Sequence, residues 1–199
     1  MRILVLLGLA LLFAAESYSP RAGQGAGAST QSPSYTADGR LNFPGNYREW
    51  IYLTSGLDMS YAPGAAMGHS RFDNVFVNPQ AYKAFLATGT WPDNTILVLE
   101  VRAAGSKASI NKSGHYQTGE VVARELHVKN EGRFPEKWAF FDFSDNQPAK
   151  QIPQEADCYS CHQQHAAVDT TFVQFYPTLF ELAKSKKTFS AAYEKEEAH

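Results

Sequence analysis

The sequence has no excess of either charge and no apolar run as long as a membrane span. Its 18 Lys and Arg residues are nearly matched by 20 Asp and Glu residues, for a formal net charge of −2. No basic patch stands out, so the sequence gives no indication of nucleic-acid binding. It also contains no internal repeat, and after removal of a short leader its length suits a single domain.

The longest apolar run lies at the N-terminus and predicts export. It covers 13 residues, from Ile3 to Ala15, and follows the basic residue Arg2. A transmembrane helix needs about 20 apolar residues. Ala15 and Ser17 place small residues at the positions that a signal peptidase reads. We therefore expect a signal peptide over residues 1–17 and a periplasmic location.

Composition divides the rest of the chain into three parts. Residues 18–40 are rich in Ser, Gly, Ala, Gln and Pro, which is typical of a flexible leader. Residues 41–187 are expected to form the folded domain. Residues 188–199 are charged, and we expect this tail to fray at its end.

Only two cysteines occur in the chain, and both belong to one motif, Cys158-Tyr-Ser-Cys161-His162. This is the attachment signature of a c-type haem. Each thiol can form a thioether with one vinyl group, and the histidine can bind the iron from one face. The motif thus predicts haem c, covalently bound, with Cys158, Cys161 and His162 as cofactor-binding residues.

Three other uses of the motif are open from the residues alone. Cys-x-x-Cys can be a thiol redox pair, although such pairs normally open a helix in a βαβ unit, which is not indicated here. A disulfide between Cys158 and Cys161 would close a very small, strained ring. Zinc could bind to both thiolates with His162 and His165, but adjacent ligands at 161 and 162 fit tetrahedral geometry poorly.

Strand and helix signals alternate along the body of the chain and indicate an α+β fold, mainly an antiparallel β-sheet with a few helices. The haem motif follows the sheet, near the C-terminus. Expected strands cover 47–56, 71–77, 95–103, 120–129 and 137–143, with a loop at 57–70. Expected helices cover 79–87, 158–165 and 172–183, the last capped by Asp169 and kinked at Pro177.

An ordered set of segments between residues 43 and 182 resembles the cytochrome P-460 family, which includes the cytochromes c′-β. The segments are Tyr47–Trp50, Phe72–Pro79, Ala81–Phe85, Thr88–Asp93, Trp138–Phe141, Cys158–His162 and Phe172–Pro177. The resemblance implies a mainly β fold, usually homodimeric, with one haem c per chain. It also implies that His162 is the proximal ligand of a five-coordinate iron whose distal side is open.

Two branches of this family differ in chemistry. The resemblance implies hydroxylamine oxidation where a lysine is joined to the porphyrin, and nitric oxide binding where that lysine is absent and the distal pocket is more apolar. The strand at 95–103 has no lysine and offers Leu97, Val98 and Leu99. The lysines nearest in sequence are expected on the surface: Lys83, Lys107, Lys112 and Lys129.

We therefore expect a periplasmic mono-haem protein that binds small ligands such as nitric oxide, transfers electrons to a periplasmic redox partner, or both. The alternative is a hydroxylamine-oxidising enzyme. Candidate proton relays are Glu100, Arg102, Glu120 and Glu125. Candidate sixth ligands are Met59, Met67, His69, His115, His127 and His165, although packing or surface roles are the ordinary expectation for each.

Overall fold

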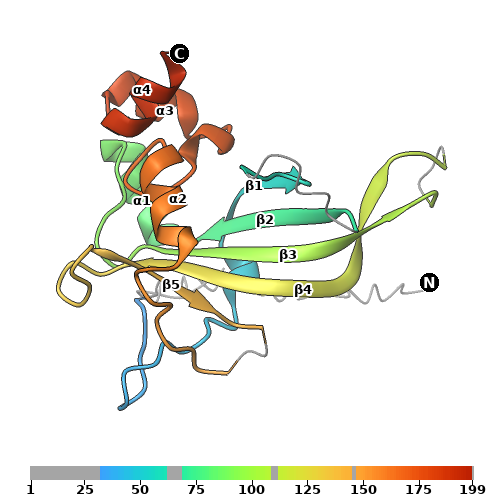
Figure 1. Ribbon diagram of the computed structural model, residues 1–199, viewed down its shortest axis with the longest axis horizontal. Coiled ribbons are helices and arrows are strands. Elements are labelled where there is room, and N and C mark those ends of the chain that lie inside the picture. The colour runs from blue at the N-terminus through green and yellow to red at the C-terminus, as the bar shows by residue number, and fades with distance from the viewer. Residues whose placement is uncertain (1–31, 62–68, 109–111, 145–146, 199) are drawn as a thin grey trace, which may run out of the picture.

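The centre of the computed structural model is a five-stranded antiparallel sheet whose strands follow chain order (Figure 1). The structure describes residues 32–61, 69–108, 112–144 and 147–198. The strands are β1 (Ile51–Leu57), β2 (Arg71–Val77), β3 (Ile96–Ser106), β4 (His115–Lys129) and β5 (Trp138–Asp142). This confirms the predicted α+β class. The predicted signal peptide and the leader up to residue 31 lie outside the described residues.

In the described residues four α-helices accompany the sheet, and Figure 1 shows α2, α3 and α4 gathered over one end of it. They are α1 (Pro79–Thr88), α2 (Asp157–His165), α3 (Phe180–Lys186) and α4 (Ala191–Glu197), with 3-10 turns η1 (Tyr47–Glu49) and η2 (Val173–Phe175). Helix α1 has Pro79 in its first turn and ends at Gly89, whose φ of 79° suits glycine. In the described part of the chain, no helix is both long and apolar enough to span a bilayer.

The sheet separates two hydrophobic cores because successive side chains of a strand point to opposite faces. On β3, Leu97 belongs to the core beneath the helices, which also contains Phe85, Trp91 and Leu179. Its neighbour Val98 belongs to the second core, on the opposite face. Side chains of β3 thus alternate between the two cores, and the helix-covered face is where a cofactor can be enclosed.

Two expected strand boundaries, at the first and the fourth strand, need correction. Residues 47–49 form η1 rather than the start of a strand, because the turn that begins at Pro44 continues through Tyr47, whose amide donates to the Pro44 carbonyl at 3.0 Å. Strand β4 begins at His115, earlier than predicted, because β3 also continues and pairs with it up to Ser106. The residues 62–68 of the expected loop lie outside the described part.

The C-terminal region differs more. The expected helix over 172–183 is split into η2 and α3, since Pro177 cannot continue the hydrogen-bond ladder. Asp169 does not cap a helix and has a left-handed φ of 51°. Within the charged tail expected at 188–199, residues 191–197 form α4, because the Ser190 hydroxyl accepts the Tyr193 amide at 3.1 Å and the Tyr193 ring is buried. His199, at the end expected to fray, lies outside the described residues.

Candidate haem site

The two cysteines and His162 lie on one side of helix α2. The helix forms over the motif as expected, and spacings of three and four residues bring Cys158, Cys161 and His162 to the same face. Both thiols are free and partly exposed. Burial raises the pKa of each thiol, and nearby carboxylates such as Asp157 raise it further. This is the opposite of the lowered pKa that a redox-active cysteine needs.

The structure also argues against zinc. Among the described residues, no group of three or more His, Cys, Asp and Glu side chains is arranged to hold a metal ion. His165 instead stacks on Tyr61, with ring centroids 4.6 Å apart, and its Nδ1 lies 3.0 Å from a Glu196 carboxylate oxygen. The imidazole that the zinc alternative requires is therefore engaged elsewhere.

One hydrogen bond fixes the tautomer of His162. Its Nδ1 lies 2.7 Å from the Thr170 carbonyl oxygen. Because a carbonyl only accepts, Nδ1 must carry the proton and Nε2 keeps its lone pair. Burial lowers the pKa of His162, while the bond to Thr170 partly opposes that effect. The ring is thus held neutral with Nε2 available, which is the form that binds a metal.

Aromatic rings enclose the His162 imidazole. Phe172, Phe140 and His127 lie with ring centroids 4.3, 4.7 and 5.0 Å from it. The helix-covered face of the sheet and the chain that follows α2 supply these rings. Such packing restricts the imidazole to one orientation and keeps water from its sides.

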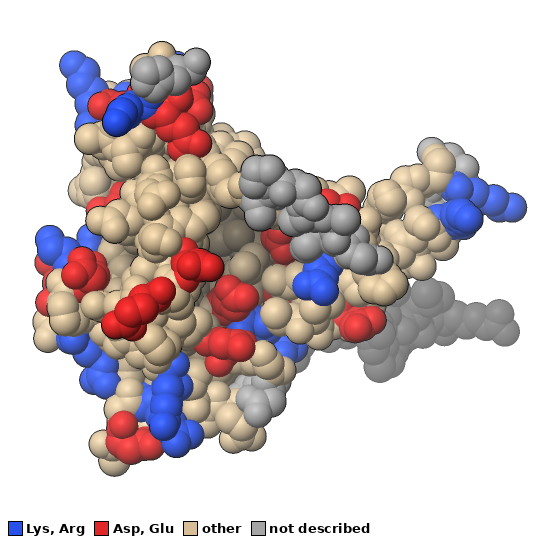
Figure 2. Space-filling view, viewed as in Figure 1, with Lys and Arg blue, Asp and Glu red and all other residues tan. Residues whose placement is uncertain are grey.

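A cavity of about 510 Å³ opens beside His162. Its volume is within the range of about 300–1,000 Å³ that is usual for cofactor pockets. Aliphatic and aromatic side chains make up most of its wall: Val75, Leu97, Leu99, Leu126, Phe140, Phe172, Phe175 and Tyr176. Figure 2 shows a hollow on this side of the molecule with carboxylate side chains gathered beside it.

The wall of the cavity is not wholly apolar, contrary to expectation. Asp73 and Glu125 also line it. Burial raises the pKa of Asp73 to about 6, with further contributions from the charges of Glu125 and Asp58. Burial also raises the pKa of Glu125, and Asp142 adds to that effect. Glu125 pairs in register with Leu99, so a carboxylate lies directly beside the apolar residues at the centre of β3 on which the expectation of an apolar pocket rested.

The other proposed proton relays lie away from the cavity. Glu100 is buried on the opposite face of the sheet, where it accepts hydrogen bonds from Tyr47, Arg48 and Arg102. Burial alone would raise the pKa of Glu100, but these partners hold it below its usual value. Arg102 is committed to Glu100, and Glu120 is exposed. Of the four candidates, the structure brings only Glu125 to the cavity.

The candidate sixth ligands are also dispersed. His69 and His115 are exposed, and Met67 lies outside the described residues. Met59 lines the cavity. His127 lines it too, but it stands edge-on beside His162 and its Nε2 lies 3.3 Å from the Thr170 hydroxyl.

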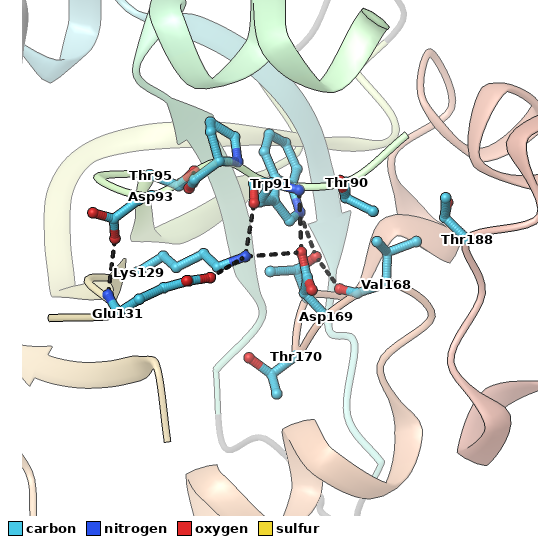
Figure 3. A network of polar contacts seen from close by, with 12 residues as sticks. Thr90, Trp91, Asp93, Thr95, Lys129, Glu131, Val168, Asp169, Thr170 and Thr188 are labelled. Atoms are coloured by element: carbon cyan, nitrogen blue, oxygen red, sulfur yellow. Dashed lines mark hydrogen bonds and ion pairs between the residues drawn. The ribbon is translucent and has the colours of Figure 1, made fainter. Parts of the chain in front are cut away.

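The positions of the lysines show whether one of them is placed to be joined to a porphyrin in the cavity. Lys83, Lys107 and Lys112 are exposed, as expected. Lys129 is not: it is only 7% exposed and donates to the Trp91 carbonyl at 2.7 Å (Figure 3). All lysines of the sequence fall within the described residues, and none of them lines the cavity.

The site combines two thiols and a neutral imidazole with one free nitrogen beside a largely apolar cavity. This set of donors fits a haem protein of the c type. The family model for Cytochrome P460 matches residues 44–173, well over half of the chain. The chain therefore belongs to the cytochrome P460 family, which implies that it binds haem. No curated protein matches the chain.

Proposed function

We propose that this protein is an exported mono-haem cytochrome, with haem c attached through Cys158 and Cys161 and the iron bound by Nε2 of His162. The observation that carries the proposal is the 2.7 Å bond from Nδ1 to the Thr170 carbonyl, which leaves Nε2 bare beside the cavity. When bound, the haem supplies a one-electron redox centre and a coordination position for a small molecule. The periplasmic location, the homodimer and a periplasmic redox partner are parts of this proposal.

Binding of a small neutral ligand such as nitric oxide is the first activity proposed, with electron transfer alongside it. The apolar part of the wall, formed by Val75, Leu97 and Leu99, favours a neutral diatomic molecule over a charged one. The position of His127 beside His162 supports a five-coordinate iron, since a sixth ligand has to approach from the opposite side. The absence of lysine from the described cavity wall supports an unmodified porphyrin edge.

Optical spectra of the purified holoprotein test this proposal. The ferric and ferrous forms are expected to show a five-coordinate haem, and nitric oxide is expected to change the ferrous spectrum with saturable, one-per-haem stoichiometry. A six-coordinate ferrous spectrum that nitric oxide leaves unchanged would contradict it.

Hydroxylamine oxidation is a second candidate, because one observation favours it. Oxidation of an N–H compound releases protons, and Asp73 and Glu125 place carboxylates with raised pKa on the cavity wall. Steady hydroxylamine-dependent reduction of an electron acceptor, weakened by Asp73→Asn and Glu125→Gln, would support this candidate. Wild-type protein that shows no such turnover would exclude it.

A further inference from the structure

The orientation of the His162 imidazole depends on a loop rather than on a side chain. The atom that accepts its Nδ1 proton is the backbone carbonyl of Thr170, so the torsions of the chain around that residue set the direction of the bond. The preceding residue, Asp169, has a φ of 51°, a left-handed conformation that aspartate tolerates better than most residues but that still costs free energy relative to glycine. Contacts of the Asp169 side chain help to hold this conformation.

Lys129 provides one set of these contacts. An oxygen of the Asp169 carboxylate accepts the Trp91 amide at 3.1 Å and lies 3.7 Å from the Lys129 ammonium. The same ammonium donates to the Trp91 carbonyl at 2.7 Å, which closes a ring of three residues (Figure 3). A buried ammonium needs such partners, and a Glu131 carboxylate oxygen also lies 3.5 Å from it. Together these contacts link Asp169 to the end of strand β4.

His127 provides the contact to the next residue of the loop. Its Nε2 lies 3.3 Å from the Thr170 hydroxyl, and its ring stacks on Phe140 with centroids 4.0 Å apart. Residues two apart on a strand face the same side. His127 and Lys129 therefore meet the consecutive loop residues Thr170 and Asp169 from one face of β4.

We propose that His127 and Lys129 are positioning residues for the proximal ligand, and the inference rests on the proposed haem function. By holding Asp169 and Thr170 in place, β4 keeps the Thr170 carbonyl on the Nδ1–H group of His162. An acceptor on that proton fixes the ring and raises the basicity of the other nitrogen. A more basic ligand favours the ferric state, so loss of this bond should weaken the iron–histidine bond and raise the reduction potential.

The test compares holoprotein variants by two measurements, the iron–histidine stretching frequency of the ferrous form and the reduction potential. Lys129→Met removes the ammonium, His127→Phe keeps an aromatic ring without the nitrogen, and Thr170→Val removes the hydroxyl but keeps the carbonyl. Each is expected to lower the frequency and raise the potential. Lys83→Met, on the exposed surface of α1, is the matched control and is expected to change neither quantity. Lys129→Arg is expected to restore part of the wild-type values.

Failure of this inference can be told apart from failure of the haem proposal. If the wild-type protein shows no iron–histidine band, His162 is not the ligand and the proposed function itself is wrong. If the wild-type band is present but His127→Phe and Lys129→Met leave both quantities unchanged, the positioning role is overturned. Should Lys129→Met not fold, Lys129→Gln, which keeps a polar side chain without the charge, decides for Lys129 by the same criterion. Thr170→Val, which alters only a partly buried hydroxyl, tests the contact with His127.

Discussion

At His162, a single carbonyl decides which ring nitrogen is free. Without the Thr170 acceptor, either tautomer of a neutral imidazole would be available, and the ring could rotate. With it, Nδ1 carries the proton, and burial keeps the ring from taking a second one. The ligand role proposed for this residue thus depends on tautomer and charge as much as on its place after Cys161.

The substitution His162→Ala tests that role. Both thioethers can still form, but the iron loses its proximal nitrogen, so the ferric and ferrous optical spectra are expected to change while the haem stays attached. The matched control is His165→Ala, three residues further along α2, which is expected to leave the spectra as in the wild type. Spectra unchanged in His162→Ala and altered in His165→Ala would reverse the assignment.

Whether a residue of the site can be identified from the sequence depends on which of its groups takes part. Cys158, Cys161 and His162 act through their side chains at a fixed spacing, and a motif records that. Thr170 acts through its backbone carbonyl, which any residue has, so no sequence pattern could have indicated it. Lys129 was expected on the surface because a lone lysine is rarely buried; its partners Trp91 and Asp169 are distant in sequence and meet it only in the fold.

On the scale of elements, the helix-covered face of the sheet carries both apolar and acidic residues along the cavity. Asp73 on β2 and Glu125 on β4 flank the apolar centre supplied by β3. Burial raises the pKa of both carboxyls; the charge of Glu125 raises that of Asp73 further, and the charge of Asp142 raises that of Glu125 further. This face thus offers an apolar centre, as proposed for a neutral ligand, and carboxylates at its edge, as proposed for proton transfer.

The raised pKa of Asp73 predicts a pH dependence of stability. A carboxyl with a folded pKa of about 6 and a reference value of 3.8 holds its proton more tightly in the folded state. The stabilisation that this bound proton contributes is fully present below pH 3.8 and is lost as the pH rises toward 6. In urea unfolding of haem-free protein, wild type is therefore expected to lose stability between about pH 4 and 6. The variant Asp73→Asn is expected to lack this loss of stability. If the free energy of unfolding changes with pH identically in both proteins, the raised pKa of Asp73 is contradicted.

The strands were more predictable than the last helices, for a physical reason. Strand β3 lies between two apolar cores, so its residues form a continuous run of aliphatic and β-branched side chains that is visible in the sequence. Helix α4 has few apolar residues, and its stability comes from one cap, one buried ring and its packing on α2. In the sequence, only Ser190 as a cap and Tyr193 as an apolar contact indicated this helix, and the many charged residues around them favoured an unstructured tail.

The cap of α4 can be tested by Ser190→Ala. The hydroxyl accepts the Tyr193 amide and donates to the Ala166 carbonyl at 2.8 Å, so its loss leaves two backbone groups without that partner. The free energy of unfolding is expected to fall by about 1 kcal/mol, the usual cost of a lost N-cap. The exposed Ser185→Ala in α3 serves as control. Equal unfolding midpoints for the two variants would show that the cap contributes nothing.

On the scale of the whole molecule, the sheet has one core on each face, and the cavity interrupts the core on the helix-covered side. The second core, with Leu41, Tyr47 and Phe141, lies on the face where Glu100 is buried and accepts a hydrogen bond from Tyr47. The fold class was predictable because it needs only the order and type of elements. The position of the cavity was not, since it depends on how residues from β1 to the chain after α2 converge.

The central claim is that one haem is held covalently by this chain at Cys158 and Cys161. The most direct test is the intact mass of protein produced with a c-type maturation system, measured after acid-acetone extraction. We predict the mass of the processed chain plus one haem, retained in the wild type and absent from the double variant Cys158→Ser/Cys161→Ser. Peptide mapping of the same sample should find the haem linked only to the Cys158–His162 peptide. A wild-type mass equal to that of the bare chain, or a haem-bearing peptide with an additional lysine link, would contradict the account.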